Sequence, residues 1–335
     1  MKILLVAVNA KYIHSNLAVY SLKAYAASKG YEIDLVEYTI NQQQDEVLRD
    51  LYGKNADVVA FSCYIWNIEF VKTLFRDYKK VRPQSEIWLG GPEVSYRGEQ
   101  LLQEFPEVRG IMVGEGEATF TKLVEMYRRM QEESVEEQLI HREMDWNNVP
   151  GIVMRDNHGE IFGTAPALPL DFSMLPFPYG QEIPEAFENR IVYYESSRGC
   201  PFSCAYCLSS IDKKVRFRNV DLVKQELAFF LEQKVPQVKF IDRTFNVNGS
   251  RTMQLLQFIK DNDNGITNFH FEIAAELLTQ AQIKLLRSLR PGLVQLEIGV
   301  QSVNEETLHA VQRKNEIAVL TCCCSRVRIY GRTPR

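Results

Sequence analysis

The arrangement of apolar residues constrains the fold of this chain more than any other feature of its sequence. Short apolar runs, which predict β-strands, occupy residues 2–8, 32–38, 57–63, 86–89 and 110–113. Amphipathic stretches, which predict helices, occupy residues 17–28, 45–51, 68–80, 98–104 and 118–131. Strands that are apolar throughout and alternate with helices are typical of a parallel sheet with helices on both faces. Residues 1–135 are therefore predicted to form a doubly wound α/β domain.

The same alternation returns after a break. Residues 136–190 hold a predicted hairpin, formed by 151–154 and 160–163, and a connector whose four prolines exclude a helix or a central strand. Strands are then predicted at residues 191–195, 237–241, 270–274 and 294–299, with helices at 221–233, 251–260 and 279–289. Residues 191–315 are thus a second α/β unit, and residues 316–335 are an atypical tail.

Length and composition restrict the class of protein. The chain has 335 residues, of which 45% are hydrophobic and 24% charged, as expected for a folded protein of about two domains. No apolar run reaches about 18 residues, and the apolar start of the chain is too short for a signal peptide. We therefore expect a cytoplasmic protein without a membrane partner. The net charge of −4 does not favour a nucleic-acid partner, a tRNA substrate included.

Glycines and polar residues follow the predicted strands of the first domain, in segments 9–14, 62–67, 90–93 and 114–117. Parallel sheets bind ligands outside the carboxyl ends of their strands, where glycine lets the backbone approach a ligand closely. These segments are therefore candidates for a binding site. The alternative is that the glycines only form tight turns.

Three of the seven cysteines, Cys200, Cys204 and Cys207, form a C-x3-C-x2-C motif after the first strand of the second unit. A [4Fe–4S] cluster normally takes four thiolates, so three would leave one iron open to a substrate or cofactor. Two alternatives are a structural zinc ion, for which no second cysteine pair lies nearby, and three inert buried thiols. The cluster is the favoured interpretation.

The motif, with Tyr206 before its last cysteine, resembles that of the radical S-adenosylmethionine (SAM) superfamily over about residues 191–312. The resemblance implies a partial (β/α) barrel whose cysteines bind the cluster, with SAM on the open iron and an electron donor such as flavodoxin or ferredoxin. Reductive cleavage of SAM would then give a 5′-deoxyadenosyl radical. The residues that match positions around SAM are Tyr206, Asp242, Glu276, Glu297 and Gln301. Polar residues at strand ends also cap helices, which is the alternative role for these side chains.

The first domain is similar to the Rossmann-like cobalamin-binding domain that precedes the barrel in one branch of this superfamily, and the whole resembles a bacterial B12-binding radical SAM subgroup. The matching residues are Asn9, His14, Ser62, Gly90, Gly91, Gly114 and Gly116. In that family the glycine pair admits the nucleotide tail of cobalamin. The D-x-H-x-x-G loop, whose histidine ligates cobalt elsewhere, is absent. We therefore expect cobalamin without a histidine lower ligand, or, as the alternative, an empty vestigial domain.

These resemblances imply a radical SAM enzyme that methylates a substrate with the help of cobalamin. The alternatives are a radical rearrangement or cyclisation, and an inactive cofactor-binding remnant. The remnant is considered because only about four of the family's usual six βα units precede the tail, which contains Cys322, Cys323 and Cys324. We expect the tail to be a truncated or frameshifted end, with an extra metal-binding tail as the alternative.

Overall fold

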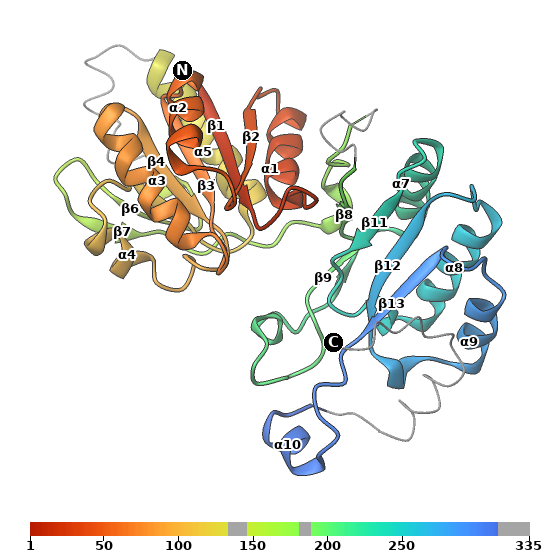
Figure 1. Cartoon of the computed structure of the whole chain (residues 1–335). Helices are drawn as coiled ribbons and strands as arrows, with labels where there is room; N and C mark the ends of the chain where they lie inside the picture. Colours follow the sequence, from red (N-terminus) through yellow and green to blue (C-terminus); the bar gives the residue numbers. More distant parts are fainter. Residues whose placement is uncertain (133–145, 181–188, 314–335) are drawn as a thin grey trace. The chain divides into compact units, whose positions relative to one another are not determined.

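The computed structural model describes residues 1–132, 146–180 and 189–313. Within these ranges the chain divides into two compact units (Figure 1). The first holds residues 1–132, 146–170 and 175–180, and the second holds residues 171–174 and 189–313. The proline-rich connector is therefore shared between the units. The tail at residues 316–335, with its three cysteines, lies outside the described residues.

The first unit is built on a sheet in the strand order β2-β1-β3-β4-β5-β6-β7. Its parallel strands are β1 (Ile3–Asn9), β2 (Asp34–Thr39), β3 (Val58–Ser62), β4 (Glu86–Gly90) and β5 (Gly110–Met112). The predicted hairpin, β6 (Ile152–Arg155) and β7 (Ile161–Gly163), extends this sheet antiparallel to β5. The α/β prediction is confirmed, whereas the sequence did not indicate that the hairpin joins the parallel sheet.

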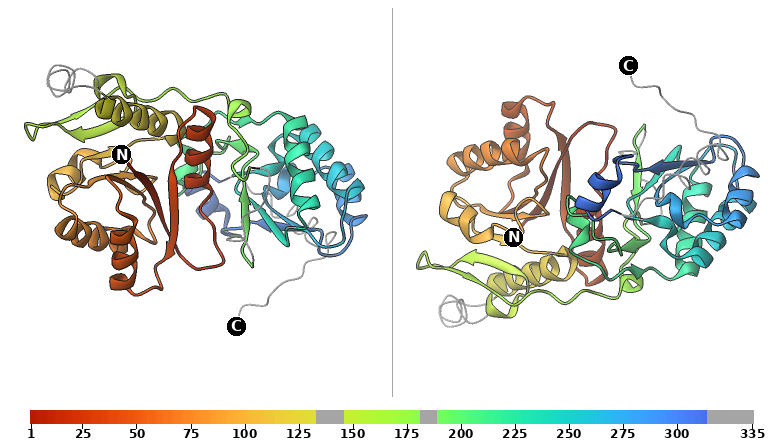
Figure 2. Two further views of the ribbon diagram at one scale, coloured as in Figure 1. Left: turned by 90° about the horizontal axis from the view of Figure 1, so that it is seen from above. Right: turned by 90° about the horizontal axis from the view of Figure 1, so that it is seen from below.

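Helices cover both faces of this sheet (Figures 1 and 2). Helices α1 (Leu17–Ser28) and α5 (Gly116–Glu132) pack together on one face, and α2 (Gln44–Lys54) and α3 (Ile68–Val81) on the other. Helix α4 (Gly98–Glu104) packs against β6. Strand β1 sends Leu4, Val6 and Val8 into the core beside α2 and α3, and Leu5 and Ala7 into the core beside α1 and α5. Successive side chains of a strand point to opposite faces, so a strand between two helical layers is apolar throughout.

The second unit contains a parallel sheet in the order β13-β12-β11-β8. Its strands are β8 (Val192–Tyr194), β11 (Gln237–Phe240), β12 (Asn268–Ile273) and β13 (Val294–Ile298). Helices α7 (Val220–Glu232), α8 (Gly249–Asp261) and α9 (Gln280–Arg287) lie along one side of it (Figures 1 and 2). In the part of the chain that the structure describes, the sheet does not close, which confirms the predicted partial barrel.

The remaining described elements are short. Strands β9 (Ser197–Arg198) and β10 (Arg216–Phe217) pair antiparallel, and helix α10 (Glu305–Ala310) follows β13. Single 3-10 turns are η1 (Trp146–Asn148) and η2 (Phe172–Met174) in the middle of the chain, and η4 (Leu208–Ser210), η5 (Phe245–Val247) and η6 (Ala275–Leu277) later. Among the described helices, none has the length and hydropathy that crossing a bilayer requires.

Candidate functional site

The three motif cysteines lie on the loop enclosed by β9 and β10, beyond the carboxyl end of β8. Cys200 and Cys204 are buried, and Cys207 is half-buried. The Cys200 amide donates to the carbonyl of Asp212 at 2.8 Å, and the Cys207 amide donates to the carbonyl of Cys204 at 3.0 Å. Backbone hydrogen bonds therefore help to shape this loop.

Gly199 lets the two sides of this loop approach each other. Its φ is +89°, a left-handed conformation that favours glycine. A Cβ atom at this position would lie 2.5 Å from the carbonyl oxygen of Lys214. The residue directly before the first cysteine is therefore restricted to glycine by both its backbone angle and its neighbour.

The chemistry of this donor set fits a [4Fe–4S] cluster, since soft thiolates are the ligands that such clusters take. Polar groups lie beside two of the sulfurs. The Thr244 hydroxyl is 3.9 Å from Cys200 Sγ, and the Arg313 guanidinium is 4.0 Å from Cys204 Sγ. Within the described ranges, no three His, Cys, Asp or Glu side chains converge in a metal-binding group.

Asp242, a predicted SAM contact, is 2% exposed and lies beneath the start of the cysteine loop. Its carboxylate accepts hydrogen bonds from the Ser196 amide (2.7 Å), the Ser196 hydroxyl (2.6 Å) and the Ser197 hydroxyl (2.7 Å). Burial raises the pKa of Asp242, and these bonds act in the opposite direction. In this geometry Asp242 anchors the strand that leads into the cysteine loop.

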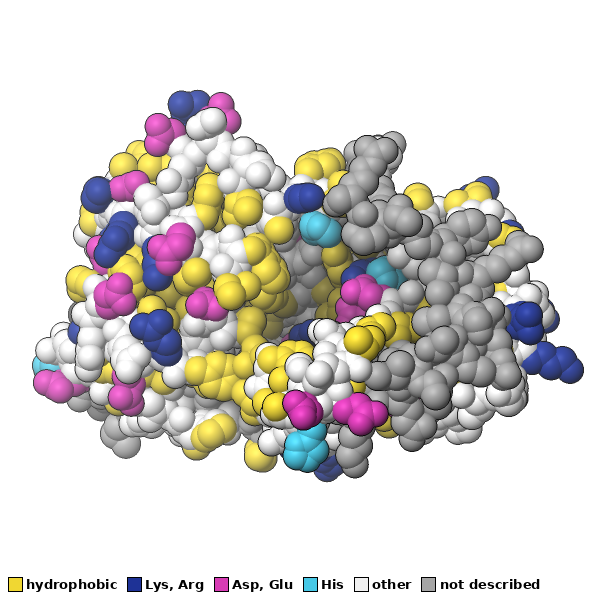
Figure 3. Space-filling view, turned by 60° about the horizontal axis from the view of Figure 1, so that its bottom comes forward, with side chains coloured by type: hydrophobic (Ala, Val, Ile, Leu, Met, Phe, Trp, Pro, Cys, Tyr) yellow, Lys and Arg dark blue, Asp and Glu magenta, His cyan; other side chains and the backbone are white. Residues whose placement is uncertain are grey.

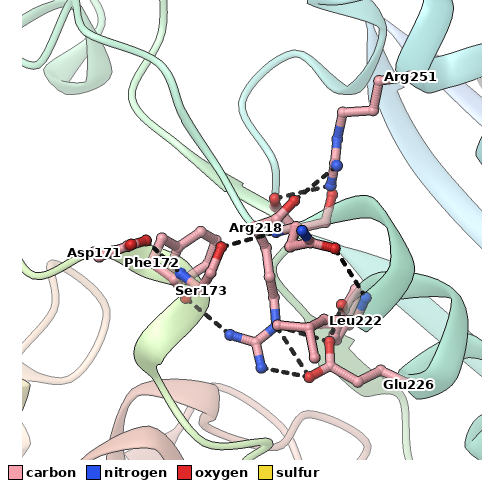
Figure 4. A network of polar contacts seen from close by, with 10 residues as sticks. Asp171, Phe172, Ser173, Arg218, Leu222, Glu226 and Arg251 are labelled. Atoms are coloured by element: carbon pink, nitrogen blue, oxygen red, sulfur yellow. Dashed lines mark hydrogen bonds and ion pairs between the residues drawn. The ribbon is translucent and has the colours of Figure 1, made fainter.

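Arg218 and Glu226 form a buried ion pair next to β10, the strand that pairs with β9 (Figure 4). Arg218 Nε donates to the two carboxylate oxygens of Glu226 at 3.0 and 2.9 Å, and Arg218 Nη1 donates to the Phe172 carbonyl at 2.8 Å. The Tyr194 hydroxyl also donates to Glu226. Arg251 donates to the carbonyls of Arg218 (2.8 Å) and Ser196 (3.1 Å). The network therefore joins β8, β10, α7 and the connector turn η2.

Charged side chains gather on the sheet face opposite the helices. Lys239 and His270 are register partners on β11 and β12, and Glu272 and Glu297 are partners on β12 and β13. Lys239 Nζ lies 3.1 Å from Glu297 and 3.7 Å from Glu272, and His270 Nε2 lies 3.1 Å from Glu297. Burial opposes ionisation of Glu297, but Lys239 and His270 together lower its pKa. Burial raises the pKa of Glu272 and lowers that of His270.

The remaining predicted SAM residues follow the carboxyl ends of strands of the second sheet. Glu276 is half-buried in η6, which follows β12. Gln301 is exposed after β13 with a φ of +64°, and its amide nitrogen would lie 2.7 Å from a Cβ at Gly299. Tyr206 is 52% exposed, and its hydroxyl accepts a hydrogen bond from Arg313 at 3.0 Å.

In the first unit, Asn9 and Glu37 organise the loop after β1. The Asn9 amide donates to the His14 carbonyl (3.0 Å) and to Glu37 (2.8 Å). Glu37 also accepts hydrogen bonds from the backbone amide of Asn16 (3.0 Å) and from the Tyr20 hydroxyl (2.8 Å). The Glu37 carboxylate therefore accepts three hydrogen bonds around this loop, and His14 takes part through its backbone carbonyl.

Ser62 lies at the end of the neighbouring strand β3 and accepts from Asn16 Nδ2 at 3.1 Å. The other amide atom, Asn16 Oδ1, is buried and has no hydrogen-bond partner among the described residues. A buried oxygen without a donor costs free energy unless a ligand or water supplies one. Asn16 is therefore a candidate acceptor for a donor group on a ligand.

The glycine pair after β4 packs against the chain itself. Gly91 has a φ of +112°, and a Cβ there would lie 2.5 Å from the Cys63 carbonyl oxygen. A Cβ at Gly90 would lie 3.3 Å from the Met112 side chain. The loops after β3 and β4 thus meet at Gly91, so this glycine is required by the fold whether or not a ligand is bound.

Gly114 and Gly116 follow β5 and differ in their surroundings. Gly114 has a φ of +81° and open space around it, whereas a Cβ at Gly116 would lie 2.9 Å from Leu22.

Hydrophobic side chains gather on the surface of this first unit, at the left of Figure 3. Large exposed hydrophobic residues on the loops that follow β1, β3 and β4 are Tyr12, Ile13, Ile65, Trp66 and Tyr96. The carboxyl ends of the strands therefore carry an apolar surface.

Several of these site residues were not predicted from the sequence. Glu37 had no distinguishing local signal, because Glu32 and Asp34 are also acidic residues of the same predicted strand. Lys239, His270 and Glu272 could have been found as charged residues at alternate positions of buried strands. Arg313 has no such local signal, because it reaches the cysteine loop across more than a hundred residues of sequence (separation 109).

Two family models match the chain. One, described as the B12 binding domain, covers residues 3–124, and the other, described as the Radical SAM superfamily, covers residues 194–331. The second match extends past residue 313, beyond the residues that the structure describes. The two matched segments contain the loops after β1 to β5 and the cysteine loop, respectively.

Individual relatives are distant and longer than this chain. It is 28% identical over 202 residues to the 2-(S-pantetheinyl)-carbapenam-3-carboxylate methyltransferase of Streptantibioticus cattleyicolor, a match that covers 57% of this chain and 28% of the relative. It is 22% identical over 312 residues to the anaerobic magnesium-protoporphyrin IX monomethyl ester cyclase of Rubrivivax gelatinosus, a match that covers 88% and 53% of the two chains.

The fold is also found in a solved structure. The cobalamin-dependent S-adenosylmethionine radical enzyme OxsB, with aqua-cobalamin and S-adenosylmethionine bound, matches with a TM-score of 0.75 at 18% identity. This match covers 97% of the present chain and 47% of OxsB. The chain thus spans about half the length, or less, of the three relatives named here.

Proposed function

Because this chain joins a B12-binding domain to a radical SAM domain, we propose that it is a cobalamin-dependent radical SAM methyltransferase. The observation that carries the proposal is the loop of Cys200, Cys204 and Cys207, which follows the first strand of the second sheet. When bound, the [4Fe–4S] cluster would supply the electron for reductive cleavage of SAM, and cobalamin would carry the methyl group. The chain itself would supply binding, orientation and exclusion of water.

In the second unit, Cys200, Cys204 and Cys207 would hold the cluster. SAM would bind beside them, with the exposed ring of Tyr206 against its adenine. Glu276, Glu297 and Gln301 would supply polar contacts to SAM. Lys239 supports this assignment, because its ammonium donates to the Glu297 carboxylate at 3.1 Å and favours its ionised form. Asp242 would act indirectly, without contacting SAM, by anchoring the strand before the cysteine loop.

In the first unit, cobalamin would bind outside the carboxyl ends of the strands. The apolar loops that carry Tyr12, Ile65 and Trp66 suit a large macrocycle, and Asn16 Oδ1 suits one of the amide groups at its edge. The predicted contacts are Asn9, His14, Ser62, Gly90, Gly91, Gly114 and Gly116. Asn9 would act by shaping the loop after β1 together with Glu37. We propose that no histidine ligates the cobalt from below.

Metal analysis tests this proposal directly. Protein purified without oxygen from cobalamin-fed cells is expected to hold about four irons and about one cobalt per chain. Cys204→Ala is expected to lose most of the iron and keep the cobalt. Cys63→Ala, which removes another buried thiol outside the motif, is the matched control for the iron and is expected to keep it. Iron without cobalt would contradict the cobalamin part of the proposal, and absence of both metals would contradict all of it.

Cyclisation is the second candidate function, because the similarity to the magnesium-protoporphyrin ester cyclase extends over 88% of this chain. Both reactions need an electron donor, for which we propose a flavodoxin or a ferredoxin. SAM labelled in its methyl group distinguishes the two reactions. Label in the product supports methylation, whereas an unlabelled product that forms only with SAM supports cyclisation or rearrangement.

A further inference from the structure

Arg313 joins three parts of the second unit at the cysteine loop. Its Nη1 donates to the Tyr206 hydroxyl at 3.0 Å and lies 4.0 Å from Cys204 Sγ. Its Nη2 donates to the carbonyl of Gly299, directly after β13. The guanidinium therefore spans the space between the end of the sheet and the loop that carries the cysteines.

The backbone around α10 directs Arg313 to this position. Asn304 caps the first turn of α10 by accepting from the Thr307 amide at 2.9 Å. After the helix, the Arg313 amide donates to the Leu308 carbonyl at 2.9 Å, and the Val311 carbonyl accepts from the Ala205 amide at 3.0 Å. The segment that carries Arg313 is thus bonded to the cysteine loop through its main chain as well as through its side chain.

Gly299 completes this arrangement. A Cβ at Gly299 would lie 3.4 Å from Arg313 Nη2 and 2.7 Å from the Gln301 amide nitrogen. A larger residue would therefore crowd the side of the guanidinium that faces the sheet. The reach of Arg313 to the cysteine loop depends on a short side chain at this point.

We propose that Arg313 is a positioning residue that holds the cysteine loop and offsets the negative charge of the thiolate-bound cluster. This inference rests on the proposed function, because it requires the cluster. A guanidinium is always charged and offers several donors in a fixed plane, so it can bond Tyr206 and Gly299 while its charge faces sulfur. Charge and hydrogen bonds near the sulfurs set the reduction potential of an iron–sulfur cluster. A positive charge at this place favours the reduced state.

The test compares Arg313→Met with Arg313→Lys. Both keep a long side chain, but only lysine keeps the charge. We measure iron per chain and then titrate the cluster potentiometrically without SAM, following the reduced state by electron paramagnetic resonance. Arg313→Met is expected to shift the ratio of reduced to oxidised cluster about tenfold toward oxidised at a fixed potential, which is about 59 mV for one electron. Arg313→Lys is expected to restore most of the shift.

Tyr206→Phe removes the hydroxyl that anchors Arg313 and is expected to shift the ratio in the same direction by a smaller factor. An Arg313→Met protein with unchanged iron content and potential would overturn the inference. The inference would also be overturned if Arg313→Met left the reduction potential unchanged and weakened only the binding of SAM. Wild-type protein without iron would instead contradict the proposed function, so the two failures are distinguishable.

Discussion

The carboxylate of Asp242 accepts three hydrogen bonds from two consecutive serines, and the second serine begins the strand that leads into the cysteine loop. A buried carboxylate needs such donors, because burial without them is costly. An amide in its place would keep one acceptor oxygen and turn the other atom into a donor. Ser196 and Ser197 would then lose part of their anchor. A single buried residue is therefore expected to determine where the cysteines lie.

Asp242→Asn tests this role against direct contact with SAM. We expect the variant to hold several-fold less iron per chain after anaerobic reconstitution, because the cysteine loop is no longer fixed at its start. Asp221→Asn makes the same chemical change at an exposed site on α7 and is expected to keep its iron. A variant with full iron and weakened SAM binding would contradict the positioning role and favour the SAM contact predicted from the sequence.

Residues that act through local spacing could be predicted, and those that act across the fold could not. Cys200, Cys204 and Cys207 could be proposed as ligands because their spacing lies within one loop. Glu37 meets Asn9 across a separation of 28 residues, and Arg313 meets Cys204 across 109. Such contacts depend on the pairing of strands and on the end of a helix, which no local pattern specifies.

At the scale of elements, the Arg218–Glu226 pair fixes β10 against α7. Both side chains are less than a tenth exposed, at 7% and 8%. Breaking a buried pair by removing one partner costs more than the pair contributes, because the other charge is left buried. Tyr194 would still donate to Glu226, but the Phe172 carbonyl would lose its donor. Loss of the Arg218 side chain is therefore expected to destabilise β8, β10, α7 and η2 together.

Arg218→Met is expected to lower the free energy of unfolding of the second unit by about 3 kcal/mol. Hydrogen–deuterium exchange of peptides that cover β10 and α7 measures this change locally. Lys122→Met breaks the exposed pair with Glu125 on α5 and is expected to change stability by no more than about 0.5 kcal/mol. Unchanged protection of β10 and α7 in Arg218→Met would show that the ion pair does not hold these elements.

The long, strongly patterned elements were predicted, whereas three of the shortest elements, β9, β10 and α10, were missed. The parallel strands and the larger helices follow from continuous apolar runs and helical periodicity. Strands β9 and β10 have two residues each, too few for any period, and they form because Gly199 lets the loop fold back. Helix α10 has six residues and depends on its Asn304 cap and on its bond to the cysteine loop. Tertiary contacts decide such elements.

At the scale of the whole molecule, each unit has buried side chains and a candidate cofactor site of its own. Helices on both faces of the first sheet form two cores, and the second sheet packs on α7, α8 and α9. The loops that meet at Gly91 belong wholly to the first unit. A distortion there is therefore expected to affect cobalamin and leave the cluster unchanged.

Gly91→Ala tests this independence. The added Cβ would lie 2.5 Å from the Cys63 carbonyl oxygen, so the loops after β3 and β4 must separate. We expect cobalt per chain to fall about tenfold while iron is unchanged, the reverse of Cys204→Ala. Gly30→Ala imposes the same left-handed strain, at a φ of +86°, in open space at the turn between α1 and β2, and is expected to keep both metals. Joint loss of iron and cobalt in Gly91→Ala would show instead that the two sites assemble together.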